Sequence, residues 1–129
     1  MKKMILLFSH TLSESQKQEA KEVYGVESFL SLPKQLQTIW SNVSPDVESV
    51  EEIMLPLKKF ISSNITKEDI ALIQGDFGAT YTMVNFCKRQ KIHTLYATTK
   101  REIIEYTNEK GEQMKKSKFE HVRFREYGK

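Results

Sequence analysis

The chain has 129 residues, of which 39% are hydrophobic and 29% charged, and this length suits one domain with one core. Its 20 Lys and Arg residues exceed its 17 Asp and Glu residues by too little for a protein that coats long nucleic acid. Residues 1–87 carry eight basic and eleven acidic side chains, whereas residues 88–129 carry twelve and six. The electropositive C-terminal third leaves a small anionic partner possible.

Neither a disulfide nor a zinc site is expected from the cysteine and histidine content. The single cysteine, Cys87, has no partner for an internal bridge, and the histidines at positions 10, 93 and 121 lack metal-ligand spacing. The apolar run at residues 4–8 is too short for a signal peptide, and no segment approaches the roughly 20 apolar residues of a membrane span. We therefore expect a cytoplasmic protein with no metal, no cofactor and no membrane contact.

The first apolar run predicts a strand followed by a helix. Residues 4–8 are continuously apolar, which is typical of a strand covered on both faces. Thr11 and Ser13 each stand three residues before a Glu or Gln, as in a capping box, so either could begin a helix. This helix is expected to end before Gly25.

The same pattern then repeats. Residues 26–32 indicate a second strand, and apolar residues recur at helical spacing over residues 36–43. Another apolar face runs over residues 47–61 and is interrupted by Pro56. We expect a kinked helix or two short helices there.

A third and a fourth strand complete the alternation. Residues 69–74 and 94–97 are strand-like, and residues 80–90 between them present an apolar helical face. Strands that alternate with helices form a parallel sheet with right-handed crossovers. The predicted fold is α/β: a Rossmann-like parallel sheet of about four strands with helices on both faces, in a single domain over residues 1–129.

The C-terminal part has a different pattern. Residues 101–107 and 119–127 are strand-like and flank a plausible turn at residues 108–111, which predicts an antiparallel hairpin at the sheet edge. The charged residues 110–118 are expected to form a solvated, mobile loop.

Two-residue alternation divides the last strand into an apolar and a cationic face. Val122 and Phe124 fall on one face. The other face is expected to carry His121, Arg123, Arg125 and Tyr127.

Polar residues follow the carboxyl ends of three predicted strands. In an open parallel sheet these ends meet at one edge, where ligands bind and where helix N-termini offer N–H groups to anions. Hydroxyls, glycine amides, an imidazole and two cations there would suit phosphate groups. The candidate site residues are Ser9, His10 and Thr11; Gln74, Gly75, Asp76, Phe77 and Gly78; and Thr98, Thr99, Lys100 and Arg101.

Several of these residues also have ordinary structural explanations. Asp76 could be a helix N-cap, and Phe77 could either stack on a base or cover the sheet end. His10 could act as a general acid or base, or could hydrogen-bond within its loop. The segment with Arg101 could be a simple turn, although a guanidinium beside two hydroxyls fits a phosphodiester well.

Five segments together resemble a known family. They are Leu-Phe-Ser-His-Thr-Leu at 7–12, Leu-Pro-x-x-Leu-Gln-x-Ile-Trp at 32–40, Gln-Gly-Asp-Phe-Gly-Ala at 74–79, Tyr-Ala-Thr-Thr-Lys-Arg at 96–101 and Phe-x-His-Val-x-Phe-Arg at 119–125. This set resembles a small stand-alone Csx family of type III CRISPR systems, distantly related to CARF domains. The resemblance implies a CARF-like homodimer that binds cyclic oligoadenylate, foremost cyclic tetra-adenylate, and cleaves it as a ring nuclease.

Metal-independent cleavage is chemically feasible, because the ribose 2′-hydroxyl of the ligand can itself attack the neighbouring phosphate. A two-fold dimer would present the same edge twice to one ring. We expect catalytic roles for Ser9, His10 and Arg101, with Lys100 as a second phosphate clamp and Gln74 and Asp76 on adenine or ribose edges. Three alternatives stay open: a binder that sequesters the ring intact, a metal-dependent phosphohydrolase using Asp76, and a protein-interaction module.

Overall fold

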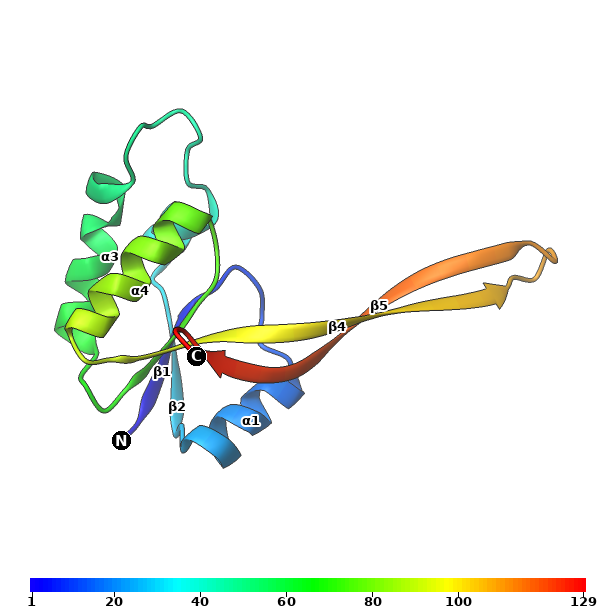
Figure 1. Cartoon of the computed structure of the whole chain (residues 1–129), viewed down its shortest axis with the longest axis horizontal. Coiled ribbons are helices and arrows are strands. Elements are labelled where there is room, and N and C mark those ends of the chain that lie inside the picture. The colour runs from blue at the N-terminus through cyan, green and yellow to red at the C-terminus, as the bar shows by residue number, and fades with distance from the viewer.

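Five strands and four helices alternate along the chain (Figure 1). The structure is a computed structural model that describes all 129 residues. The elements are β1 (Lys3–Leu7), α1 (Glu14–Tyr24), β2 (Ser28–Ser31), α2 (Lys34–Ser41), α3 (Glu51–Asn64), β3 (Ile70–Ile73), α4 (Phe77–Arg89), β4 (His93–Thr107) and β5 (Gln113–Glu126).

The strands form one sheet in the order β2-β1-β3-β4-β5. The first four are parallel, and β5 runs antiparallel to β4. The predicted α/β class and C-terminal antiparallel hairpin are confirmed, and the arrangement is consistent with a Rossmann-like sheet, with five strands. Because β2 and β3 lie on opposite sides of β1, the order of the strands reverses between β1 and β3, where such sheets bind ligands.

Helices cover both faces of the sheet, as predicted. Alternate residues of β3 point to opposite faces of the sheet. Ile70 and Leu72 pack in the hydrophobic cluster under α1, and Ala71 and Ile73 pack in the hydrophobic cluster under α2, α3 and α4. All four are buried, which explains why the run is continuously apolar. No helix combines the length and apolar character needed to cross a membrane.

Local signals set the ends of α1. Ser13, rather than Thr11, forms the capping box: its Oγ accepts from the N–H of Gln16, whose side chain accepts from the N–H of Ser13. The helix ends at Gly25, which has a φ of 70°.

The α3 region is a single helix that begins at Glu51 and runs through Pro56. The predicted apolar helical face began at residue 47, which is four residues before the helix begins. Pro56 lacks the N–H that an interior residue donates to the preceding turn, but Met54, Leu57 and Ile61 are fully buried around it. Packing of this face outweighs the lost hydrogen bond.

The C-terminal prediction was wrong in its boundaries. Residues 94–97 and 101–107 belong to one 15-residue strand, β4, and β5 already begins at Gln113, inside the segment expected to be a mobile loop. Thirteen pairs of residues join the two strands. The predicted turn is present, because Asn108 Oδ1 accepts from the N–H groups of Lys110 and Glu112 at 2.9 Å each.

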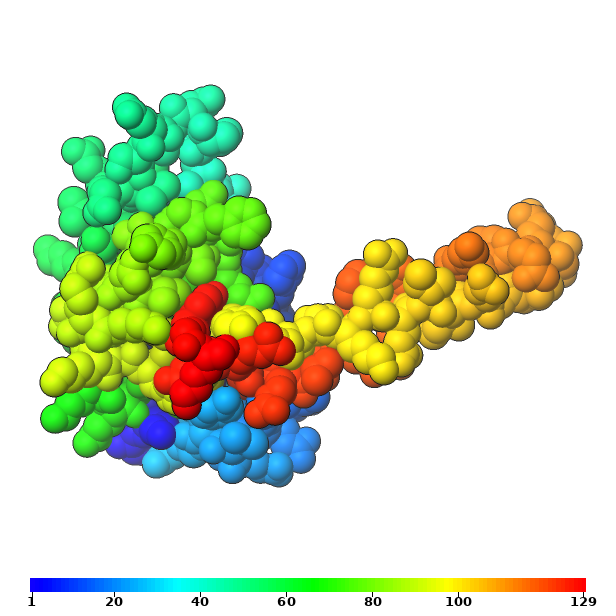
Figure 2. All heavy atoms as spheres, in the orientation of Figure 1, coloured from blue at the N-terminus to red at the C-terminus, as the bar shows by residue number.

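The outer part of this hairpin, residues 99–120, extends from the rest of the molecule, and we call it the arm (Figure 1). The remaining residues are called the body. Figure 2 shows the arm standing clear of the body over most of its length. At about 3.3 Å per residue, the nine arm residues of β4 span about 30 Å.

A β-bulge lies at the base of the arm. Thr98 pairs with Arg123 and Thr99 pairs with His121, so Val122 is an extra residue on β5. The bulge breaks the two-residue alternation. His121 therefore lies on the buried side with Phe124, at 4.9 Å between ring centroids, while Val122 is exposed. The predicted grouping of Val122 with Phe124, and of His121 with the arginines, was wrong for this reason.

Candidate functional site

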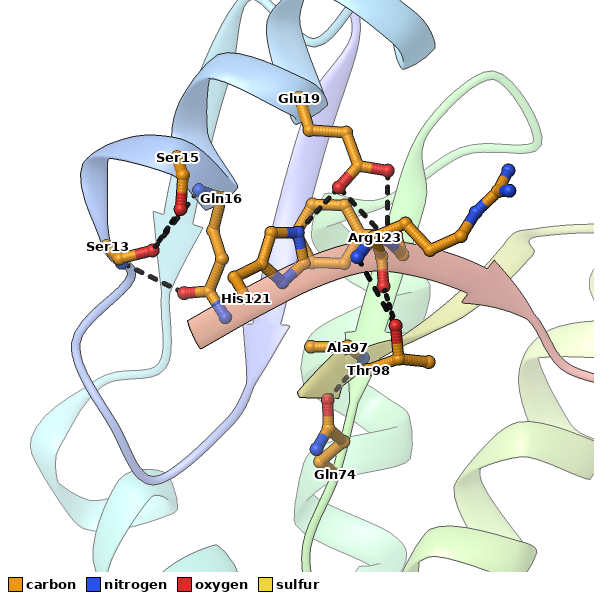
Figure 3. A network of polar contacts seen from close by, with 10 residues as sticks. Ser13, Ser15, Gln16, Glu19, Gln74, Ala97, Thr98, His121 and Arg123 are labelled. Atoms are coloured by element: carbon orange, nitrogen blue, oxygen red, sulfur yellow. Dashed lines mark hydrogen bonds and ion pairs between the residues drawn. The ribbon is translucent and has the colours of Figure 1, made fainter. Parts of the chain in front are cut away.

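The carboxyl ends of β1 and β3 meet the middle of β4 at Gln74. Its N–H donates to Leu7 C=O at 2.9 Å, and its side-chain oxygen accepts from the N–H of Ala97. Trp40 Nε1 donates to Gln74 C=O at 3.0 Å. Figure 3 shows the Gln74 side chain directed at Ala97. Six of the twelve predicted candidates line two hollows on either side of β4, three in each.

The first hollow lies on the α4 side, and we call it the α4 hollow. It has a volume of about 360 Å³ and is lined by Gln74, Gly75, Phe77, Thr80, Tyr96 and Tyr127. Burial raises the pKa of Tyr127, the neighbouring Tyr96 phenol adds to this, and the Tyr127 hydroxyl donates to Ile73 C=O. Phe77 is 95% exposed at its rim.

Structural contacts account for several predicted residues near this hollow. Asp76 is the N-cap of α4, accepting from Ala79 N–H at 3.0 Å. A Cβ on Gly75 would come within 2.9 Å of the Trp40 indole, so close packing requires glycine there. Gly78 is under no such constraint, since its nearest neighbour would be Asp76 Oδ2 at 3.5 Å.

The second hollow lies between the start of α1 and the base of the arm, and we call it the α1 pocket. It has a volume of about 680 Å³, within the range of small-molecule sites. Its lining residues come from four separate segments: Phe8, His10, Thr11, Ser13, Gln16, Thr99, Phe119 and His121. Three predicted residues, His10, Thr11 and Thr99, are thus brought together here.

His121 is the most unusual side chain of the α1 pocket. It is 5% exposed, and its Nε2 lies 2.6 Å from a carboxylate oxygen of Glu19 on α1 (Figure 3). Its Nδ1 is buried and has no hydrogen-bond partner. When Nε2 carries the proton that Glu19 accepts, Nδ1 carries a lone pair that has no hydrogen-bond partner within the chain.

Glu19 also fixes the backbone of the bulged strand. Both of its carboxylate oxygens accept from Phe124 N–H, at 3.0 and 2.9 Å. One side chain therefore orients the imidazole and holds the β-bulge that turns it inward. Sequence reasoning missed Glu19 and His121, since neither lies near the other in sequence and the bulge leaves no clear pattern.

His10 occupies the mouth of the pocket, edge-on to Phe8 at 5.5 Å between ring centroids. Beyond it lies a further hollow of about 380 Å³, which shares Phe8, His10 and Thr11 with the α1 pocket and includes Lys17. The combined surface offers two imidazoles, several hydroxyls, three phenyl rings and one ammonium group.

The remaining predicted residues do not line the α1 pocket. Ser9 Oγ is hydrogen-bonded to Ser41 Oγ at 2.9 Å, and Thr98 Oγ1 donates to Arg123 C=O at 2.7 Å. Lys100 and Arg101 lie on the arm. Lys100 pairs with Glu102 at 3.8 Å, whereas Arg101 lies 5.9 Å from the Phe119 ring centroid and donates to Ser117 Oγ at 3.1 Å.

These features define an α/β protein with a five-stranded, mostly parallel sheet, a two-histidine pocket and a long C-terminal arm. Residues 2–125 match the family described as "Uncharacterized protein MJ1673 family", and the chain belongs to that family. It is 44% identical over 127 residues to "Uncharacterized protein MJ1673" of Methanocaldococcus jannaschii, covering 98% of each chain. No solved structure matches the chain.

Proposed function

We propose that this protein is a cytoplasmic ring nuclease of CARF-like fold that binds cyclic oligoadenylate, foremost cyclic tetra-adenylate, and cleaves it without a metal. The observation that carries the proposal is that His10 and the Glu19-held His121 line the same pocket. Two imidazoles can supply the base and the acid that phosphodiester transfer needs. The resemblance of its five sequence segments to a Csx family supplies the ligand class.

The pocket also has groups suited to the rest of such a ligand. Phe8 and Phe119 present rings on which adenine can stack, and stacking contributes roughly 1–3 kcal/mol per base. Thr11, Ser13 and Thr99 offer hydroxyls to ribose and phosphate oxygens. Lys17 lies in the adjoining hollow and can neutralise a phosphate.

In the proposed step, ligand binding uncovers His121 Nδ1, which is buried in the free protein. Nδ1 then takes the proton of a ribose 2′-hydroxyl, and that oxygen attacks the adjacent phosphorus. The bond from phosphorus to the 5′-oxygen of the next nucleotide breaks, and His10 donates the proton that this oxygen needs. The product is a linear chain with a 2′,3′-cyclic phosphate and a 5′-hydroxyl. Glu19 stabilises the imidazolium that forms on His121.

The test is incubation of the purified protein with radiolabelled cyclic tetra-adenylate in EDTA. Linear products in excess of the protein support the proposal. Binding of one equivalent with the ring left intact would instead establish a sequestering protein, which is the second candidate. Activity that disappears in EDTA would favour the metal-dependent alternative with Asp76, and absence of binding would favour an interaction module.

Histidine variants test the assignment of roles. Replacing His10 or His121 with alanine should lower turnover by about 100-fold or more, with a smaller effect on affinity. His93→Ala is the matched control, because His93 lies at the opposite end of β4, paired with Glu126 at 3.3 Å. Equal activity of all three variants would show that the α1 pocket is not the reaction site.

A further inference from the structure

The arm carries several large apolar side chains among its charged ones, and no other element of the chain covers them. Its exposed side chains include Ile103, Ile104, Tyr106, Met114 and Phe119, and no residue from 99 to 120 is buried. Figure 2 shows the near side of the ribbon uncovered by the body along most of its length. An isolated two-stranded ribbon is only marginally stable in water, so an arm of this length benefits from a further strand.

One edge of the arm is ready to pair. Strand β4 is bonded to β3 only through residues 93–95, so its outer edge is free of strand partners along the arm. The N–H of Ala97 points to that outer edge, where Gln74 accepts it. By two-residue alternation, the N–H and C=O groups of Thr99, Arg101, Ile103, Glu105 and Thr107 point the same way.

The charges on this edge favour one symmetric register. When two copies of β4 pair antiparallel around a two-fold axis, the residue on the axis lies opposite its own copy. Every other residue lies opposite the residue that is equally far from the axis on the other side in sequence. An axis at Arg101, Glu102 or Glu105 places identical charges directly opposite each other. An axis at Ile103 places Arg101 opposite the partner's Glu105 twice, and the two Ile103 side chains side by side.

We propose that the arm is a dimerisation element, in which β4 of two copies pair antiparallel around a two-fold axis at Ile103 to form a four-stranded sheet. The outward backbone groups of residues 99–107 then form hydrogen-bonded pairs across the axis. Lys115, 3.9 Å from Glu105 in its own chain, extends each charge pair into a row of three. The occupant of this edge is a second copy because the edge is complementary to itself.

The register also brings each arm to the site of the other copy. Thr107 at the tip of one arm stands opposite the partner's Thr99, which lines the α1 pocket of that copy. The two Thr99 residues are about 26 Å apart along the paired strands. Each copy thus completes the rim of its partner's pocket, and each pocket would hold a ligand of its own rather than share one ring.

Charge reversal tests the register. Arg101→Glu and Glu105→Arg each place like charges opposite one another twice and should raise the dimer dissociation constant by about tenfold or more. The double variant restores both pairs with reversed sign and should recover most of the affinity. Lys116→Glu is the control, because it makes the same charge reversal on β5, which the partner's β4 does not touch. The measurement is sedimentation equilibrium over a range of concentrations.

Cross-linking tests the axis without relying on arm stability. The two Ile103 Cα atoms would be about 5.5 Å apart, within disulfide range, so Ile103→Cys should give a covalent dimer on mild oxidation. Ile104→Cys should not, since its copies lie about 8 Å apart. Burial raises the pKa of Cys87 to about 12, so the native thiol does not compete.

A monomer at every concentration tested, or single charge variants that dimerise as well as the unmodified protein, would overturn the proposal. A dimer in which Ile104→Cys cross-links as readily as Ile103→Cys would overturn the register. These measurements need no nucleotide, so their outcome does not depend on the proposed ring cleavage.

Discussion

The body and the arm both contain β-strands but differ in what stabilises them. In the body, β1 and β3 are apolar on both faces and lie between helices. In the arm, charged and apolar side chains alternate on both faces, and no residue is buried. The body is thus held by a hydrophobic core, whereas the arm is held by strand pairing alone.

Two phenylalanines on β5 test this difference most strongly. Phe124 is fully buried in the body and Phe119 is 66% exposed on the arm. Phe124→Ala should lower the free energy of unfolding by about 3–5 kcal/mol, because it leaves a cavity under α1. Phe119→Ala should change it by less than about 0.5 kcal/mol. Urea denaturation followed by circular dichroism measures both, and equal effects would contradict the division into body and arm.

Glu19 tests the junction between the two regions. Glu19→Ala leaves Phe124 N–H and His121 Nε2 without their acceptor, and should cost about 2–3 kcal/mol of stability. Glu22→Ala on the same helix is the control, since Glu22 is exposed and only accepts from Gln18 at 3.0 Å. If both variants were equally stable, Glu19 would not be what holds the base of the arm.

The smallest effect concerns pH. Burial alone would raise the pKa of Asp69 in the body, but hydrogen bonds from the N–H groups of Lys3 and Thr66 outweigh it and lower the pKa. A lowered folded-state pKa means that Asp69 stabilises the fold above about pH 4 and that this contribution is lost as the pH falls through the folded-state value. Asp69→Asn should therefore cost about 1–2 kcal/mol at neutral pH and progressively less in acid.

Glu120 on the arm is the comparison for Asp69. Its hydrogen bond and ion pair with Lys118 lower its pKa as well, but the pair is exposed to solvent. Glu120→Gln should leave the pH dependence of unfolding unchanged. Urea midpoints measured from pH 3 to pH 7 for both variants provide the test.

The body was largely predictable because its signals are local or periodic. The apolar runs of β1 and β3, the capping box at Ser13 and the glycine at position 25 each depend on a few consecutive residues. Asp76 is the N-cap that the pattern allowed. His10 and Thr11 were correctly placed after the carboxyl end of β1, whereas Thr99, expected after the end of the fourth strand, lies within β4.

Three features depended on tertiary structure. The division of the edge into two hollows follows from where β4 passes between α1 and α4. The bulge at Val122 turns His121 inward, against the two-residue alternation of the strand. The bulge is held by the hydrogen bond from Phe124 N–H to Glu19, which lies 105 positions earlier in the chain. The arm is continuous because β4 and β5 pair with each other beyond the point where β4 stops pairing with β3.

The sequence alone therefore determined the elements, the α/β class and the edge where polar residues gather, because hydrophobic periodicity and capping act between near neighbours. The folded chain alone decided which polar residues meet. A hydrogen bond such as that between Glu19 and His121 joins residues about a hundred positions apart, and no local pattern encodes it.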